Sequence, residues 1–180
     1  LTVSSAASDV YKRQVKDSGV KTFIIHARKG ILKGLSPRQN RNIPPLNYQK
    51  VYSIKDDFPE LEIIINGGIK NISEAKNHLN FVDGVMLGRA AYDDPFMLSD
   101  IDSEIYANTK IEISRKDLLT EYLDYVHLMT KKGYDPKIML KHVFGLKKGE
   151  KDAKRFRVKV AEIMNSSSLV ENKDELLSMV

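Results

Sequence analysis

Two glycine-containing segments have the residue types and the spacing to bind an anion. Asn66-Gly67-Gly68 directly follows the apolar run Leu61–Ile65, and Gly88-Arg89 follows the apolar run Val85–Leu87, which starts twenty residues later. A glycine just past a buried strand leaves backbone N–H groups open to a ligand, and arginine carries a planar fork of donors that matches a phosphate. A tight turn would explain either segment alone, but the two in succession predict a phosphate-binding site.

His26 ends another run, Thr22–Ile25, that is rich in β-branched residues. If this run is a strand, His26 lies on the same carboxyl-terminal rim as the two glycine segments, where the active sites of (β/α)8 barrels are found. A single histidine there can be a hydrogen-bonded structural group or a ligand contact, and both remain open. Asn66, at the end of the next run, can orient its loop or hydrogen-bond a ligand ring.

The distribution of charge predicts a polyanionic partner. The loop 27–46, which includes Arg38 and Arg41, contains five cations and no acid, and residues 131–159 contain eleven Lys or Arg against three acids. Lys154 and Arg157 are three residues apart, so they point the same way from a helix. Cations with this spacing suit the phosphates of an RNA backbone. A solvated helical surface would have a similar composition, and that alternative stays open.

The composition argues against several classes of protein. Apolar residues make up 42% of the 180 residues and charged residues 29%, which is ordinary for a globular protein. The apolar runs are too short to cross a membrane. Cysteine is absent, and the four histidines have no metal-motif spacing. We therefore expect a cytoplasmic protein with no metal site and no membrane contact.

The order of the expected elements is that of a parallel α/β fold. Strands are expected at 21–26, 61–65 and 82–87, with helices at 48–56 and 73–79, the second of them capped by Ser73. Three strands cannot close a barrel, so residues 15–105 are expected to be the C-terminal part of a (β/α)8 TIM barrel. Residues 1–14 have no clear period and stay unassigned, as a lead-in or a non-native junction.

A separate α-helical domain is expected over residues 106–180. Ser114 and Asp117 fit a capping box at the start of a long amphipathic helix. Asp135-Pro136 starts a second helix, because proline is tolerated at the first helical position. Further helices are expected at 153–164 and from 171 onward. In the first of these, the residues expected to face a core are Phe156, Val160 and Ile163.

An ordered series of strings between residues 15 and 164 resembles the flavin-dependent tRNA-dihydrouridine synthases. The similarity is closest to their A-type bacterial branch, which acts at tRNA positions 20 and 20a. A bare Asn-Gly-Gly is weak evidence, whereas the whole series in this order is specific. The strings are His26–Lys29, Leu32–Pro37, Asn40-Arg41, Ile43–Leu46, Ile65–Ile69 and Asp83–Tyr92.

The resemblance implies an FMN-binding barrel followed by a tRNA-binding helical domain. We expect the protein to be monomeric. NADPH would reduce the flavin, which would then reduce a uridine of the tRNA D-loop to dihydrouridine. By match to the family motifs, His26 contacts the flavin, and its ribityl phosphate is held by Asn66, Gly67, Gly68, Gly88 and Arg89. The positions that correspond to tRNA-orienting cations are Arg38, Arg41, Lys154 and Arg157.

One departure from the family pattern bears on activity. The family uses a cysteine as the proton donor, and this sequence contains none. We therefore expect a C-terminal fragment without a catalytic residue, which forms no dihydrouridine by itself. Two other functions stay open: a different FMN-dependent TIM-barrel oxidoreductase acting on a small molecule, and a non-catalytic RNA-binding module. The basic loop and basic helix argue against the first, and flavin binding would argue against the second.

Overall fold

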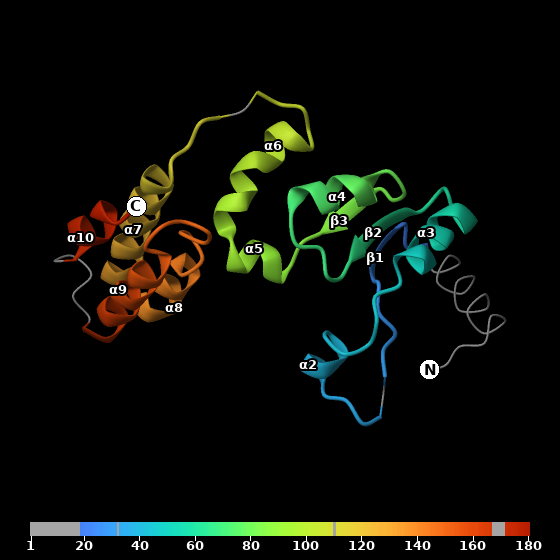
Figure 1. The fold of residues 1–180 in the computed structure, drawn as a ribbon, viewed down its shortest axis with the longest axis horizontal. Coiled ribbons are helices and arrows are strands. Elements are labelled where there is room, and N and C mark those ends of the chain that lie inside the picture. The colour runs from blue at the N-terminus through green and yellow to red at the C-terminus, as the bar shows by residue number, and fades with distance from the viewer. Residues whose placement is uncertain (1–18, 32, 110, 167–171) are drawn as a thin grey trace. The chain divides into compact units, whose positions relative to one another are not determined.

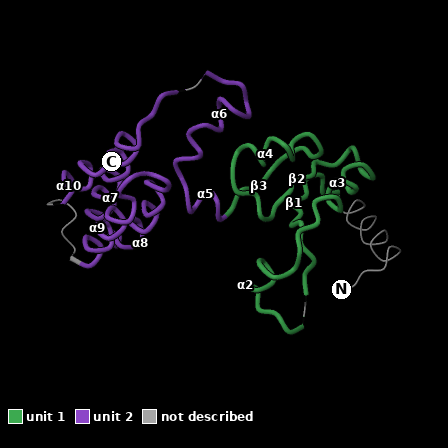
Figure 2. The backbone as a smooth tube through the Cα atoms, viewed as in Figure 1, with its two compact units in different colours: residues 1–88 green, residues 89–180 purple. Residues whose placement is uncertain are grey.

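The computed structural model describes residues 19–31, 33–109, 111–166 and 172–180. By packing, the chain divides into two compact units, residues 1–88 and residues 89–180 (Figure 2). Each unit has its own buried core and is described by itself. The predicted domain boundary between residues 105 and 106 stays a prediction, and the unassigned residues 1–14 lie outside the described part of the chain.

The first unit is built on a three-stranded parallel sheet in the order β1-β2-β3 (Figure 1). The strands are β1, Thr22–His26; β2, Glu62–Asn66; and β3, Gly84–Met86. The predicted α/β class with three parallel strands is thereby confirmed, and only the strand ends differ. His26 pairs with Asn66 and Asn66 with Met86, so the carboxyl ends of the three strands lie level.

One face of this sheet is covered and the other is open in the described residues. Ile63 and Ile65 are buried under the helices α3, Tyr48–Asp57, and α4, Ile72–Leu79, which contribute Val51 and Ala75. On the opposite face Ile24 is 59% exposed. Because successive side chains of a strand alternate between faces, the run of isoleucines supplies both a helix-covered layer and an open layer.

Two local features of the first unit differ from the sequence analysis. Helix α4 is capped by Asn71, whose side chain accepts from Glu74 N at 2.8 Å, so the prediction of Ser73 as the cap was wrong. Asparagine is at least as good a cap as serine, and it begins the helix two residues earlier. The loop 27–46 also contains a short helix, α2, Pro37–Asn40, which has a capping box between Ser36 and Gln39.

The second unit is entirely helical in its described residues. Its elements are α5 Arg89–Asp93, η1 Pro95–Asp100, α6 Ile101–Glu104, α7 Arg115–Lys131, α8 Pro136–Leu140, η2 Lys141–Val143, α9 Ala153–Ser166 and α10 Lys173–Ser178. The predicted capping box of α7 is present, and Asp135 caps α8, with Pro136 in its first turn. The core includes Leu119, Leu123, Val126, Leu140, Val143, Leu146, Phe156, Val160, Ile163 and Leu176.

Helix α5 and η1 pack against the rest of the second unit at Gly145. A Cβ atom on Gly145 would lie 2.4 Å from the Asp93 carbonyl oxygen and 2.9 Å from Pro95 Cδ. Nearby, the Arg115 guanidinium lies 3.9 Å from the centroid of the Phe96 ring. Residue 145 is thus held against backbone, which cannot move aside as the end of a side chain can.

We therefore expect Gly145→Ala to lower the free energy of unfolding of the second unit by about 2 kcal/mol, the usual cost of overpacking. Urea unfolding followed by circular dichroism measures the change. The matched control is Gly30→Ala, because no described atom lies within 4 Å of a Cβ at Gly30 and its φ is not positive. Equal stabilities of the two variants would contradict the tight packing at Gly145.

No helix among the described residues is long and apolar enough to cross a membrane. No group of three or more His, Cys, Asp or Glu side chains among them could hold a metal ion.

Candidate functional site

The structure brings His26 and Asn66 together at the carboxyl rim of the sheet. They are register partners in β1 and β2, and Ala27 N donates to Asn66 O at 2.7 Å just beyond them. Asn66 Nδ2 lies 3.4 Å from Met86 Sδ on β3. Parallel pairing therefore places the end of each strand beside the next, as the sequence analysis expected of a common rim.

The Gly67-Gly68 turn follows Asn66 directly and requires glycine at both positions. Gly67 has φ +120° and Gly68 has φ +74°, a region of backbone conformation that residues with a Cβ rarely adopt. A Cβ on Gly67 would lie 3.2 Å from His26 Cε1, and one on Gly68 would lie 2.5 Å from Leu46 Cδ1. His26 and Leu46 therefore pack against the turn, in which Gly67 is buried and Gly68 is half-buried.

Gly88 differs from the Gly67-Gly68 turn in that the protein itself does not require glycine there. Its φ is not positive, and no described atom lies within 4 Å of the place a Cβ would take. It stands two residues beyond Met86, which pairs with Asn66. Gly88 is exposed, so its backbone is accessible to solvent. Arg89 is exposed and follows Gly88 as the first residue of α5.

A tyrosine that the sequence analysis did not single out also contacts the glycine turn. Tyr48 begins α3, and its hydroxyl donates to Gly67 O at 2.9 Å. Its ring lies 4.4 Å, centroid to centroid, from the ring of His78, which is buried. No local pattern could have revealed this contact, because it joins residues nineteen positions apart through the tertiary fold.

The basic loop is closed at its base by hydrogen bonds of two of its own side chains. Arg28 Nη1 donates to Pro44 O and to Asn42 O, the latter at 3.3 Å. Asn40 Oδ1 accepts from Ile31 N at 2.8 Å, and its Nδ2 donates to Ile31 O at 2.9 Å. These bonds tie the two halves of the loop together.

Arg38 and Arg41 lie on the outside of this closed loop. Arg38 is on α2 and Arg41 is its C-cap residue, and both side chains are exposed. Neither forms an ion pair within the described part of the chain. The loop therefore offers two cations whose charge is not neutralised by neighbouring acids.

Helix α9 has the two faces that its sequence predicts. Phe156 and Val160 are fully buried, whereas Lys154 and Arg157 are exposed. Lys159, in the same basic segment, is instead paired with Glu175 of α10 at 2.6 Å. The positive charge of α9 that a partner could reach therefore includes Lys154 and Arg157, whereas the charge of Lys159 is neutralised by Glu175.

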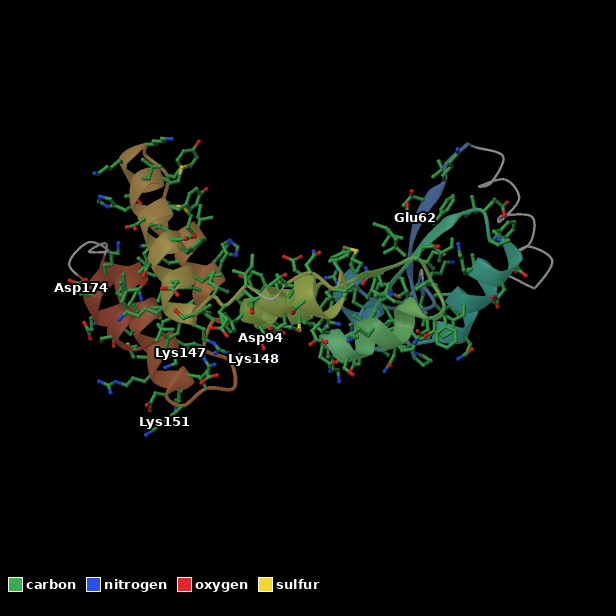
Figure 3. The ribbon with its side chains drawn as sticks, turned by 90° about the horizontal axis from the view of Figure 1, so that it is seen from above. Glu62, Asp94, Lys147, Lys148, Lys151 and Asp174 are labelled. Atoms are coloured by element: carbon green, nitrogen blue, oxygen red, sulfur yellow. The ribbon has the colours of Figure 1, made fainter. Side chains whose placement is uncertain are left out.

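The segment between η2 and α9 adds further cations, Lys147, Lys148 and Lys151, which are labelled in Figure 3. Lys147 donates to Met179 O and so helps to hold the end of the chain. Lys148 and Lys151 are exposed. The cationic surface of the second unit therefore extends from α9 into the segment before it.

Comparisons with known proteins show the family of the chain. The family model described as dihydrouridine synthase matches residues 7–179. The chain is 42% identical over 144 residues to the tRNA-dihydrouridine(20/20a) synthase of Pseudomonas putida, covering 80% of the chain and 43% of the relative. For the enzymes of the same name from Haemophilus ducreyi and Synechocystis sp., the identities are 44% over 140 residues and 42% over 143 residues, covering 78% and 79% of the chain.

In both of these relatives, too, the chain covers 43% of the relative. The chain thus spans less than half the length of the curated relatives it matches. The match includes nearly every residue of the chain itself, from the glycine turns to the basic helix. The chain belongs to the dihydrouridine synthase family.

Proposed function

We propose that the chain carries the FMN phosphate site and the tRNA-binding surfaces of an enzyme that reduces uridine to dihydrouridine at positions 20 and 20a of the tRNA D-loop. NADPH is the proposed reductant of the flavin. The proposal is supported by the activity for which the relatives are named and by the resemblance of the sequence strings. The observation that carries it is the Gly67-Gly68 turn packed on His26 at the strand rim.

The residues present fit the phosphate of FMN. The half-buried Gly68 has a backbone N–H that no described group accepts, and at Gly88 no described atom lies within 4 Å of the place a Cβ would take. Arg89, adjacent to Gly88 in the chain, supplies the charge that neutralises a phosphate. Asn66 orients the turn, and His26, whose ring supports it from below, is placed to contact the flavin.

When bound, FMN supplies the hydride that reduces the uracil ring. The residues of this chain hold the phosphate and orient the ring at the rim. The sequence contains no cysteine, so it has no thiol to donate the proton that completes the reduction. We therefore propose that the 180-residue chain binds its cofactor and its RNA without turning the substrate over.

The exposed cations serve the RNA. Arg38 and Arg41 on the closed loop of the first unit, and Lys154 and Arg157 on α9 of the second, contact backbone phosphates and orient the tRNA. A uridine reaches a flavin only after it leaves its stack, and contacts to backbone phosphates would hold the RNA while it does so. The proposed role of these residues is therefore positioning, not chemistry.

A flavin titration of the 180-residue chain tests the proposal. We expect saturable quenching of FMN fluorescence and binding of riboflavin at least about tenfold weaker, because riboflavin lacks the phosphate. Unmodified tRNA should bind, and no dihydrouridine should form when NADPH is added.

Each other outcome of this titration has a distinct meaning. A chain that binds RNA but no flavin would be an RNA-binding module. A chain that binds flavin but not tRNA would favour an FMN enzyme for a small molecule. Dihydrouridine produced by the chain alone would contradict the proposed lack of turnover.

A further inference from the structure

Tyr48 is held rigidly at the start of α3. The backbone of the preceding residue, Asn47, donates to Ala27 O at 2.7 Å, which fixes the start of the helix to the end of β1. The Asn47 side chain caps α3 by accepting from Lys50 N at 3.0 Å. The Tyr48 ring rests against the buried His78 of α4. The hydroxyl of Tyr48 therefore has a defined position relative to the sheet rim.

A second tyrosine, Tyr52, contacts His78, the residue on which the Tyr48 ring packs. Tyr52 Oη lies 2.6 Å from His78 Nδ1, and the Tyr52 ring stacks on Phe81 with centroids 4.5 Å apart. Burial lowers the pKa of His78, and burial also raises the pKa of Tyr48, so both are neutral near pH 7. A protonated Tyr48 hydroxyl is the form that can donate to a carbonyl.

The hydrogen bond from Tyr48 to Gly67 O also fixes the direction of the Gly68 N–H. A trans peptide is planar, so the carbonyl of Gly67 and the N–H of Gly68 point in opposite directions. Holding Gly67 O toward the Tyr48 hydroxyl turns the Gly68 N–H away from α3. No described group accepts a hydrogen bond from Gly68 N. Glycine at both positions would otherwise let this peptide plane rotate freely.

From this geometry we propose that Tyr48 is a positioning residue, which aims the Gly68 N–H at the phosphate of the cofactor by holding the Gly67 carbonyl. The inference rests on the proposed function, since it assigns the donor of that same site. A donor fixed in advance loses little conformational freedom on binding, so the gain appears as affinity for the phosphate group in particular. Tyr48 itself does not touch the ligand.

The test compares FMN and riboflavin binding in Tyr48→Phe and in Tyr52→Phe, using the 180-residue chain. Tyr48→Phe keeps the ring against His78 and removes only the hydroxyl. We expect FMN affinity to fall about tenfold, with riboflavin affinity unchanged, because only FMN has the phosphate. Tyr52→Phe removes a hydroxyl from the same cluster but not from the turn, so the ratio of the two affinities should stay at the wild-type value.

The ratio separates positioning from a merely structural role. A loss of stability in Tyr48→Phe would weaken both ligands together. An unchanged FMN-to-riboflavin ratio in Tyr48→Phe would overturn the inference. If the wild-type chain shows no preference for FMN over riboflavin, the proposed phosphate site fails first, and the two failures are thereby distinguished.

A second measurement tests the Gly68 amide in the wild-type chain before it tests the variant. In the wild-type chain labelled with ¹⁵N-glycine, titration with inorganic phosphate should shift the Gly68 amide resonance more than that of Gly30, which lies in the basic loop. In Tyr48→Phe the Gly68 shift should be smaller. A Gly68 amide that does not respond in a wild-type chain that binds FMN would contradict the assignment.

Discussion

Replacement of Arg38, Arg41, Lys154 and Arg157 by alanine is expected to weaken tRNA binding by at least about a hundredfold near physiological salt. These four cations are exposed, and none is paired with an acid in the described residues. Phosphate contacts release condensed counterions, so their loss also flattens the salt dependence. The slope of log K against log salt should fall by about three. Fluorescence anisotropy of labelled tRNA at several salt concentrations measures both.

The matched control removes the same amount of charge elsewhere. Lys21, Lys50, Lys70 and Lys116 are exposed and lie outside the basic loop and α9. Their quadruple alanine variant has the same net charge as the first variant, so the long-range attraction of RNA falls equally in both. We expect it to bind tRNA within about threefold of wild type. If both variants lost affinity alike, total charge and not the two surfaces would govern binding.

Within the loop, the positions of Arg38 and Arg41 depend on Asn40 and Arg28, which are not among the proposed RNA contacts. Asn40 bonds both the N–H and the carbonyl of Ile31, and Arg28 holds Asn42 O and Pro44 O. These bonds reduce the number of conformations available to the loop, and in the proposed function they would lower the entropy lost on RNA binding. This explains how a segment with little regular structure can present Arg38 and Arg41 in a fixed place.

The elements of this fold were predictable where the signal is local. The alternation of β-branched runs with amphipathic helices located all three strands, and Ser114 with Asp117 located the start of α7. Two nearby residues can both be good N-caps, and α4 is capped by Asn71 and not by Ser73. The helix α2 was missed because proline and basic residues dominate its surroundings, although Ser36 and Gln39 carry a capping-box signature.

The candidate site was predictable only in part, because much of it depends on contacts between distant residues. The sequence shows that glycines follow two strands. It does not show that Gly67 and Gly68 have positive φ and close neighbours, whereas Gly88 has neither. Leu46, which packs under Gly68, reaches it only because the chain returns along Arg28 after the loop. Likewise the bond from Tyr48 to Gly67 requires α3 to lie against β2. Sequence spacing contains no record of either contact.

Because the two glycine segments differ, substitutions in them are expected to change different properties: stability at Gly68 and FMN binding at Gly88. Gly68→Ala would hold a residue with a Cβ at a φ of +74° and push aside Leu46 Cδ1, 2.5 Å from that Cβ, so we expect it to lower the free energy of unfolding by about 1–3 kcal/mol. At residue 88 an added Cβ would meet no described atom within 4 Å and φ is not positive, so we expect the unfolding midpoint of Gly88→Val to equal that of wild type.

Gly88→Val is expected to affect FMN binding and not stability. Gly88→Val should bind FMN at least about a hundredfold more weakly while fully folded, because branched carbons would occupy the place of the phosphate and leave its charge without donors. Gly88→Ala, with a single added carbon, should show a smaller loss, and this gradation distinguishes steric exclusion from a general effect on the fold. Urea unfolding and flavin fluorescence on the same samples measure both quantities. A folded Gly88→Val chain with wild-type FMN affinity would mean that the phosphate does not approach this strand end, and the site would then have to be rebuilt around the Gly67-Gly68 turn alone.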